Sequence, residues 1–160
     1  MSGLSCHPLP PDQASAVFPL VREAIPGHDL RTWQRFARRA TDPKRAGREG
    51  IMVVVRSPRP MPCGLFVYRK EQELGHGEVL IAEHFVAVDL LDAEPVMQTL
   101  ISELDQLARR LGCSAIRAMV LNPSSQTAAQ LATAGHRPAG SALWKDVEAP
   151  AGEETMPPGY

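Results

Sequence analysis

The sequence predicts a mixed α/β fold, in which a single sheet begins as an antiparallel meander and continues in alternation with helices. Two observations lead to this prediction. Three strand-like runs follow one another directly between residues 50 and 90, and helix-like and strand-like runs then alternate up to residue 147. A chain of 160 residues is long enough for one domain with a sizeable core, which we expect to span residues 1–147. We predict helices on both faces of the sheet.

Two helices are expected before the meander. The first lies within residues 10–25, where Asp12 can cap it and Pro19 predicts a kink or a late start. The second follows Asp29, which is a suitable N-cap, and carries apolar residues at helical spacing over residues 30–40. A short strand over residues 4–9 is expected to lead the domain.

The remaining elements follow in order. The meander strands are predicted over residues 50–57, 63–72 and 79–90, and the first is a nearly continuous β-branched run typical of a strand buried on both faces. A long helix follows, ending before Gly112, which suits a left-handed C-terminal cap. The expected ranges of this helix and the later elements are residues 95–111 (helix), 114–121 (strand), 123–135 (helix) and 141–147 (strand). Residues 148–160 are rich in proline, glycine and glutamate and are predicted to be disordered.

Composition argues against several classes of protein. The formal net charge is −1, so bulk charge does not draw the chain to nucleic acid or to a membrane surface. No apolar run is long enough to cross a bilayer, and we expect no secretory signal. The three cysteines are far apart, and the histidines lack metal-ligand spacing. We therefore predict reduced thiols, no metal site and a cytoplasmic location.

Three segments carry a resemblance to a known family: HFVAVD over residues 84–89, LISELDQLARRLGCSAIRAMVL over residues 100–121 and NPSSQTAAQLATAGHRPAG over residues 122–140. Their order and spacing resemble those of the GNAT acetyltransferase superfamily, and the resemblance extends from Leu4 to about Val147. It implies a GNAT-like mixed sheet, acetyl-CoA or another acyl-CoA as the acyl donor, and a small-molecule or protein amine as the acceptor.

The resemblance also implies where the cofactor would bind. One part of the site is a strand edge that meets the pantetheine arm of acetyl-CoA. The other parts are a pyrophosphate loop at a helix start and an asparagine in a later loop. The positions that match these cofactor-binding residues are Val86, Ala87, Val88, Val96, Met97 and, after a small shift in alignment from Ser124, Asn122.

The helix start at residues 92–97, DAEPVM, departs from the family. Its spacing from the LGC motif at residues 111–113 places there the family's Arg/Gln-x-x-Gly-x-Gly/Ala loop, and none of the three defining positions matches. Pro95 has no N–H, and Asp92 and Glu94 place carboxylates at the positive end of the helix, where they disfavour a diphosphate. This pattern is typical of a capped helix start rather than of a phosphate cradle. We therefore expect weak or absent binding of ordinary acetyl-CoA.

Glu83 is the candidate catalytic residue. It matches the region where some members of the family carry a glutamate base, which would take a proton from the attacking amine. His84 is next to it, but neighbours along a strand point to opposite faces, so we do not expect the two to act as a pair. The acid tyrosine that is frequent in the family falls on Leu131.

Arg31, Arg35 and Arg38 share one side of the second predicted helix. Bidentate arginines there favour recognition of an anionic acceptor or partner, and a solvated helix face is the alternative interpretation. Nucleic acid is not favoured as the partner, because no aromatic platform accompanies the charge.

Two functions remain open. The first is an N-acyltransferase with an atypical cofactor loop, in which the amine attacks the acyl thioester directly. The second is a non-catalytic module of the same fold that binds a protein or an anionic ligand. The missing glycine loop and the missing tyrosine favour the second, whereas the fold is equally expected under both. Members of the family often form homodimers, although the sequence shows no exposed stripe that requires one.

Overall fold

The computed structural model describes residues 3–148, so the predicted tail lies, except for residue 148, outside the described residues. A five-stranded sheet in the order β1-β2-β3-β4-β5 forms the centre of the molecule. The strands are β1 (Leu4–Pro8), β2 (Glu49–Arg56), β3 (Met61–Glu73), β4 (Gly77–Ala87) and β5 (Ala115–Ala118). The first three pairings are antiparallel and the pairing of β4 with β5 is parallel. This is the mixed sheet that the sequence predicts.

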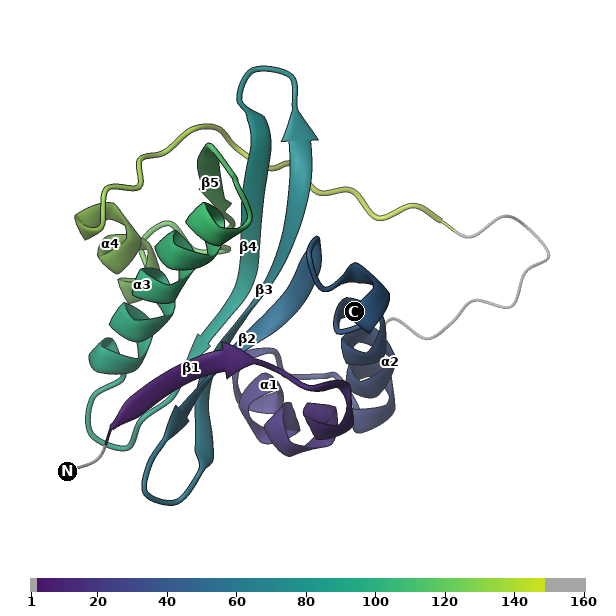
Figure 1. The fold of residues 1–160 in the computed structure, drawn as a ribbon, viewed down its shortest axis with the longest axis vertical. Coiled ribbons are helices and arrows are strands. Elements are labelled where there is room, and N and C mark those ends of the chain that lie inside the picture. Colours follow the sequence, from purple (N-terminus) through teal and green to yellow (C-terminus); the bar gives the residue numbers. More distant parts are fainter. Residues whose placement is uncertain (1–2, 149–160) are drawn as a thin grey trace.

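Helices cover both faces of this sheet, as expected (Figure 1). On one face lie the 3₁₀ helix η1 (Pro11–Val17), α1 (Phe18–Ala24) and α2 (Leu30–Ala40). On the other face lie α3 (Glu94–Arg110) and α4 (Gln126–Thr133). A 3₁₀ turn, η2 (Pro43–Arg45), lies between α2 and β2.

Local signals in the sequence set several helix ends. The carboxylate of Asp29 accepts a 2.7 Å hydrogen bond from the backbone N–H of Thr32, which confirms the predicted cap of α2. The first α-helix begins only at Phe18, because Pro19 is tolerated in the first turn of a helix but not further inside. Gly112 follows α3 with a φ of 72°, the left-handed conformation that the C-terminal cap requires.

An apolar core lies on each side of the sheet. Successive residues of β2 enter different cores: Met52 and Val54 pack with α3, and Ile51 and Val53 pack with η1, α1 and α2. This confirms that β2 is buried on both faces. The buried indole of Trp33 on α2 also donates a 2.7 Å hydrogen bond to the carbonyl of Ala14, which joins α2 to η1.

The prediction of a last strand over residues 141–147 is wrong. These residues form no helix or strand, and Leu143, Trp144 and Val147 are 97%, 91% and 89% exposed. An apolar pattern favours a strand only where a neighbouring strand supplies hydrogen-bond partners. Within residues 3–148, β5 has β4 as its only partner, so the segment lacks a pairing strand. β5 itself is shorter than the predicted 114–121.

Candidate functional site

A cleft opens where β4 and β5 separate. The two strands pair only from Val79 opposite Ala115 to Ala82 opposite Ala118, and the backbone N–H of Met119 then donates to the carbonyl of Ala82 over 2.8 Å. β5 ends there, while β4 continues to Ala87. Beyond this point lies a cleft of about 330 Å³. Its walls are residues 85–88, the start of α3, the end of α1 and one side of α4, so it is lined from both faces of the sheet.

Four of the predicted cofactor-binding residues lie together in this cleft. Val86, Ala87 and Val88 form the wall that β4 contributes, and Met97 faces them from the first turn of α3. Because no strand of residues 3–148 pairs with this part of β4 on the cleft side, the backbone groups that point to that side are available to hydrogen-bond an extended ligand. The N–H of Val88 is not one of them, since it donates to the carbonyl of Cys63 over 2.8 Å.

The other two predicted cofactor residues lie elsewhere. Val96 is fully buried, and it packs so closely on β3 that a Cβ added at Gly64 would lie 2.6 Å from its Cγ1. The side-chain oxygen of Asn122 accepts a 2.9 Å hydrogen bond from the backbone N–H of Ser124, so this residue organises the turn before α4 and does not line the cleft.

Sequence reasoning missed much of the polar lining. These residues are Glu23 at the end of α1, together with Gln126, Thr127 and Gln130 of α4. Each is a common residue for an exposed helix surface, so no local signal distinguishes it. Glu94 also lines the cleft, and none of the described lining residues is a lysine or an arginine. The polar part of the cleft is therefore acidic or neutral, which suits a cationic or uncharged group better than a diphosphate.

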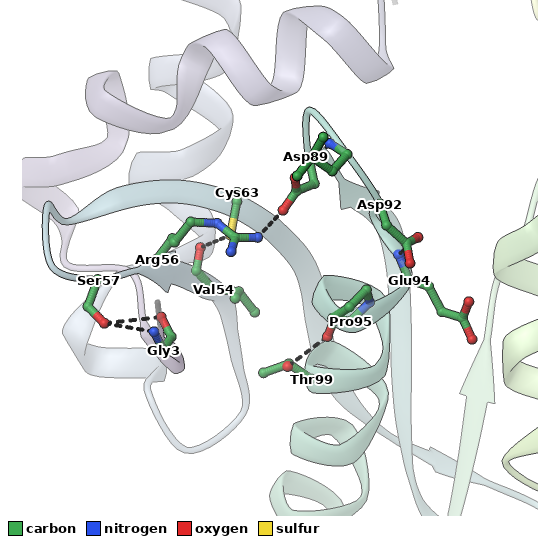
Figure 2. Close-up of polar contacts among 11 residues, drawn as sticks. Gly3, Val54, Arg56, Ser57, Cys63, Asp89, Asp92, Glu94, Pro95 and Thr99 are labelled. Atoms are coloured by element: carbon green, nitrogen blue, oxygen red, sulfur yellow. Dashed lines mark hydrogen bonds and ion pairs between the residues drawn. The ribbon is translucent and has the colours of Figure 1, made fainter. Parts of the chain in front are cut away.

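The loop before α3 uses its own carboxylates to satisfy its backbone donors (Figure 2). The carboxylate of Asp92 accepts a 2.9 Å hydrogen bond from the N–H of Glu94, and that of Asp89 accepts a 3.0 Å hydrogen bond from the N–H of Leu91. Pro95, the next residue, has no N–H to offer. Three positions at this helix start thus present no free donor to a phosphate.

A cation beside this loop is also engaged in an ion pair. Arg56, at the end of β2, forms an ion pair with Asp89 (Figure 2). The hydrogen bond from Leu91, and then the charge of the Arg56 guanidinium, hold the pKa of Asp89 below its ordinary value. Sequence reasoning did not find this pair, because its members are 33 residues apart. The geometry does not fit a pyrophosphate held by this loop.

A bulge in β4 corrects the expected orientation of Glu83 and His84. Leu65 of β3 is opposite Val86, whereas Val67 is opposite Glu83, so β4 carries one extra residue here. His84 has a φ of 58°, and its ring meets that of Phe36 on α2, with centroids 5.9 Å apart. Since Val67 also points towards the α1–α2 face, both Glu83 and His84 lie on that face rather than on opposite faces.

Glu83, the predicted base, is held by another side chain. Its carboxylate accepts a 2.5 Å hydrogen bond from the guanidinium of Arg69, and it does not line the cleft. Leu131, at the position of the family's acid tyrosine, is 3% exposed and packs in the core beside α3. Glu23 and Glu94 are the ionisable side chains that do line the cleft.

The arginines predicted to bind an acceptor lie outside the cleft. Arg31, Arg35 and Arg38 are exposed on α2, and none of the ion pairs within residues 3–148 involves them. They form a basic surface on the opposite side of α2 from its buried residues Trp33 and Ala37.

The cysteines do not have the character of nucleophiles. All three are unpaired, and burial raises the pKa of each thiol, that of Cys6 to about 12. A thiol with so high a pKa stays protonated at neutral pH, and the thiolate is the reactive form. Among residues 3–148, no three side chains of histidine, cysteine, aspartate or glutamate gather in a way that could hold a metal ion. No helix in this range is both long enough and apolar enough to cross a membrane.

Several solved structures with a similar architecture are described as acetyltransferases. The aminoglycoside N-acetyltransferase AAC(6')-Iy, solved in complex with CoA, matches with a TM-score of 0.75 at 10% identity, covering 93% of this chain and 97% of that one. A Trypanosoma brucei acetyltransferase matches with a TM-score of 0.71 at 17% identity, over 91% and 100%. A transcriptional regulator from Bacillus halodurans matches with a TM-score of 0.76 at 10% identity, over 91% and 100%.

These likenesses establish the fold. The chain has the mixed α/β fold of the GNAT acetyltransferases, as the sequence predicts. No family model and no curated protein sequence matches the chain. At 10–17% identity a shared fold does not fix an activity, and one of the three similar structures is described as a regulator.

Proposed function

We propose that the protein is an N-acyltransferase that moves an acyl group from a thioester to an amine in the cleft between β4 and α4. The observation that carries this proposal is the edge of β4 at residues 85–87, which opens into the cleft and which no strand of residues 3–148 covers on that side. An extended thioester arm would add to that edge through backbone hydrogen bonds, and this would hold the acyl carbonyl in a fixed position.

The reaction is a direct transfer. The amine nitrogen attacks the thioester carbonyl carbon, the carbon–sulfur bond breaks, and the amine proton leaves through a base while the thiolate is protonated. Glu83 is the proposed base, and Glu23 is the competing candidate because its side chain lines the cleft whereas that of Glu83 is held by Arg69. The acidic lining also favours a cationic amine as the acceptor.

The proposal includes weak use of the nucleotide part of CoA. At the start of α3, Asp92 occupies the N–H of Glu94, Pro95 has no N–H, and Asp89 neutralises Arg56. A pyrophosphate would therefore find fewer donors and no free Arg56 at this loop. We expect acetyl-CoA to bind no more than about threefold more tightly than acetyl-pantetheine, which lacks the diphosphate and the nucleotide.

Calorimetric titration of acetyl-CoA and acetyl-pantetheine tests two claims: that the cleft binds an acyl thioester, and that the nucleotide part of CoA adds little affinity. The double variant Glu94→Gly, Pro95→Gly removes one charge and restores one N–H, so acetyl-CoA should bind about tenfold more tightly. Acetyl-pantetheine is the matched control, since its affinity should not change. An unchanged affinity for acetyl-CoA would contradict our account of the loop. No binding of either thioester at millimolar concentration would refute the transferase.

The base can be identified by assaying two variants, Glu83→Gln and Glu23→Gln, with an acyl thioester and a panel of amines. Loss of the base should lower kcat by about 10²–10⁴-fold while the affinity for the thioester stays the same. If neither variant lowers kcat, neither carboxylate is the base.

A non-catalytic binding module is the second candidate, favoured by the exposed arginines of α2. Arg31, Arg35 and Arg38 lie on a surface separate from the cleft, so their role can be tested separately. A polyglutamate peptide should bind the wild type, and the triple Arg→Gln variant should bind it at least about tenfold more weakly, with the difference falling at high salt. Equal binding by the two proteins would leave this surface as a solvated helix face.

A further inference from the structure

Basic side chains are concentrated in one short part of the chain. Residues 30–48 hold seven of the 17 lysines and arginines and only one of the 18 acidic residues, whereas the whole chain has a formal net charge of −1. All seven basic residues are exposed, and Arg45 is the only one of them that forms an ion pair within residues 3–148. The α2 basic surface consists of these seven residues: Arg31, Arg35, Arg38, Arg39, Lys44, Arg45 and Arg48.

Three of these arginines form a stripe along α2. Arg31, Arg35 and Arg38 are four and three residues apart, so the Cβ atoms of neighbours in the stripe lie about 5–6 Å from each other. The stripe lies opposite the buried residues Trp33 and Ala37 and is about 10 Å long. A row of separate cations suits a linear polyanion better than a single small anion, because each guanidinium can pair with a different negative group.

An exposed aromatic ring lies beside this stripe. Phe36 is 41% exposed, and its ring stacks on that of the buried Trp33, with centroids 5.9 Å apart. The ring of His84 meets Phe36 edge to face from β4. Arg39 is three residues after Phe36, so the two side chains are neighbours on the helix surface. A supported ring next to a row of cations is the combination that binds single-stranded nucleic acid, since bases stack on the ring and phosphates pair with the cations.

The sequence disfavours nucleic acid because no aromatic platform is evident beside the charge, and the exposed ring of Phe36 removes that objection. An acidic peptide would also pair with the arginines, but its carboxylates would gain nothing from the negative face of an aromatic ring. We propose that the α2 basic surface, together with Phe36, binds single-stranded nucleic acid through its phosphates and at least one stacked base. None of these residues lines the cleft, so this binding does not depend on the transferase activity.

Fluorescence anisotropy of labelled strands, titrated with the full chain, measures this binding. The probes are single strands of about 12 uridines or about 12 thymidines, and polyglutamate of the same net charge is the comparison. At about 50 mM salt, both strands should bind at least about tenfold more tightly than polyglutamate. Because each contacted phosphate of a single strand contributes about −0.7 to the slope of log K against log salt, three or four contacts should give a slope of about −2 to −3. Tighter binding of the uridine strand would assign RNA as the partner, and tighter binding of the thymidine strand would assign DNA.

Substitution of the stripe tests where the strand binds. Changing Arg31, Arg35 and Arg38 together to glutamine should weaken binding of both strands at least about tenfold and reduce the salt slope by about 2. The matched control changes three exposed arginines outside α2 to glutamine, none of which forms an ion pair within residues 3–148: Arg59, Arg109 and Arg137. Both triple variants alter the net charge equally, and the control should bind within about twofold of the wild type. Equal losses would show that only overall charge matters and would overturn the proposal.

Two substitutions of Phe36 isolate the ring. Phe36→Leu keeps an apolar contact with Trp33 but cannot stack on a base, so both strands should bind at least about fivefold more weakly while polyglutamate binding stays the same. Phe36→Trp should keep the affinity of the wild type, and urea unfolding checks that both variants are folded. No binding of either strand at about 200 µM protein would overturn the proposal. So would polyglutamate that binds as tightly as the strands with no effect of Phe36→Leu, a result that would assign the surface to an acidic protein.

Discussion

The two halves of β4 have the same neighbour on one side and different surroundings on the other. Val79–Ala82 pairs with both β3 and β5 and is buried on both faces. After the bulge at His84, β4 keeps β3 but loses β5, and residues 85–88 line the cleft instead. The first half of β4 thus belongs to the core and the second half to the candidate site. The boundary between the halves lies where β5 ends. We expect substitutions in the first half to change stability and those in the second half to change mainly ligand binding.

The largest effect on stability is expected in the first half. Leu80 is fully buried and packs in the core beside α3, so Leu80→Ala should lower the free energy of unfolding by about 2–5 kcal/mol through lost contacts and the cavity left behind. Urea unfolding followed by circular dichroism measures this. Leu90→Ala, at an exposed position beyond β4, is the control and should change stability by no more than about 0.5 kcal/mol. Similar losses for the two variants would remove the distinction between the halves.

Substitutions of His84, at the bulge between the two halves of β4, should have an intermediate effect on stability. At the φ of 58° of His84, a β-branched residue is disfavoured and glycine is not. Both His84→Val and His84→Gly lose the ring contact with Phe36, so the difference between them reports the backbone. We expect the valine variant to be less stable than the glycine variant by about 1–2 kcal/mol in urea unfolding. Equal stabilities would mean that the bulge is absent in solution.

The smallest effect on stability is expected at Asp89, which follows the second half of β4. Its pKa is lowered in the folded state from 3.8 by the N–H of Leu91 and by Arg56. Its contribution to stability is therefore present above pH 3.8 and is lost as the pH falls through the folded pKa. Asp89→Asn should be less stable than the wild type at neutral pH, and the difference should shrink below pH 3.8.

A double-mutant cycle measures how much of this stability difference comes from the ion pair between Arg56 and Asp89. Urea unfolding of Arg56→Gln, Asp89→Asn and the double variant at several pH values gives their coupling energy. The coupling should disappear at low pH, when Asp89 is protonated. A coupling that does not depend on pH would mean that the carboxylate charge is not what joins the two side chains.

Most of the fold could be predicted because its signals are local. The β-branched run of β2, the cap residue Asp29 and the left-handed Gly112 each act on the few residues around them. The wrong prediction at residues 141–147 has the same origin. A strand pattern is local, but its pairing partner is not, and no feature of Leu143 or Trp144 reports where β5 lies.

The candidate site was only partly predictable, because most of its features depend on register and distance. Residues 86–88 and Met97 were found through their position in a recognisable motif. The bulge at His84 depends on how β3 aligns with β4. The pairing of Arg56 with Asp89 joins the end of β2 to the loop after β4, and Glu23 reaches the cleft only through the packing of α1. None of these is encoded in a short stretch of sequence.

The way in which the start of α3 is capped has a consequence for competition among metabolites. Nucleotides, sugar phosphates and inorganic phosphate are abundant in cells, and an ordinary anion-binding helix start can hold any of them. Here Asp92 occupies the N–H of Glu94 within the chain itself, so these compounds should not compete for this end of the cleft. A ligand that binds along residues 86–88 would then be selected by its amide groups and its shape, whatever the phosphate concentration around it.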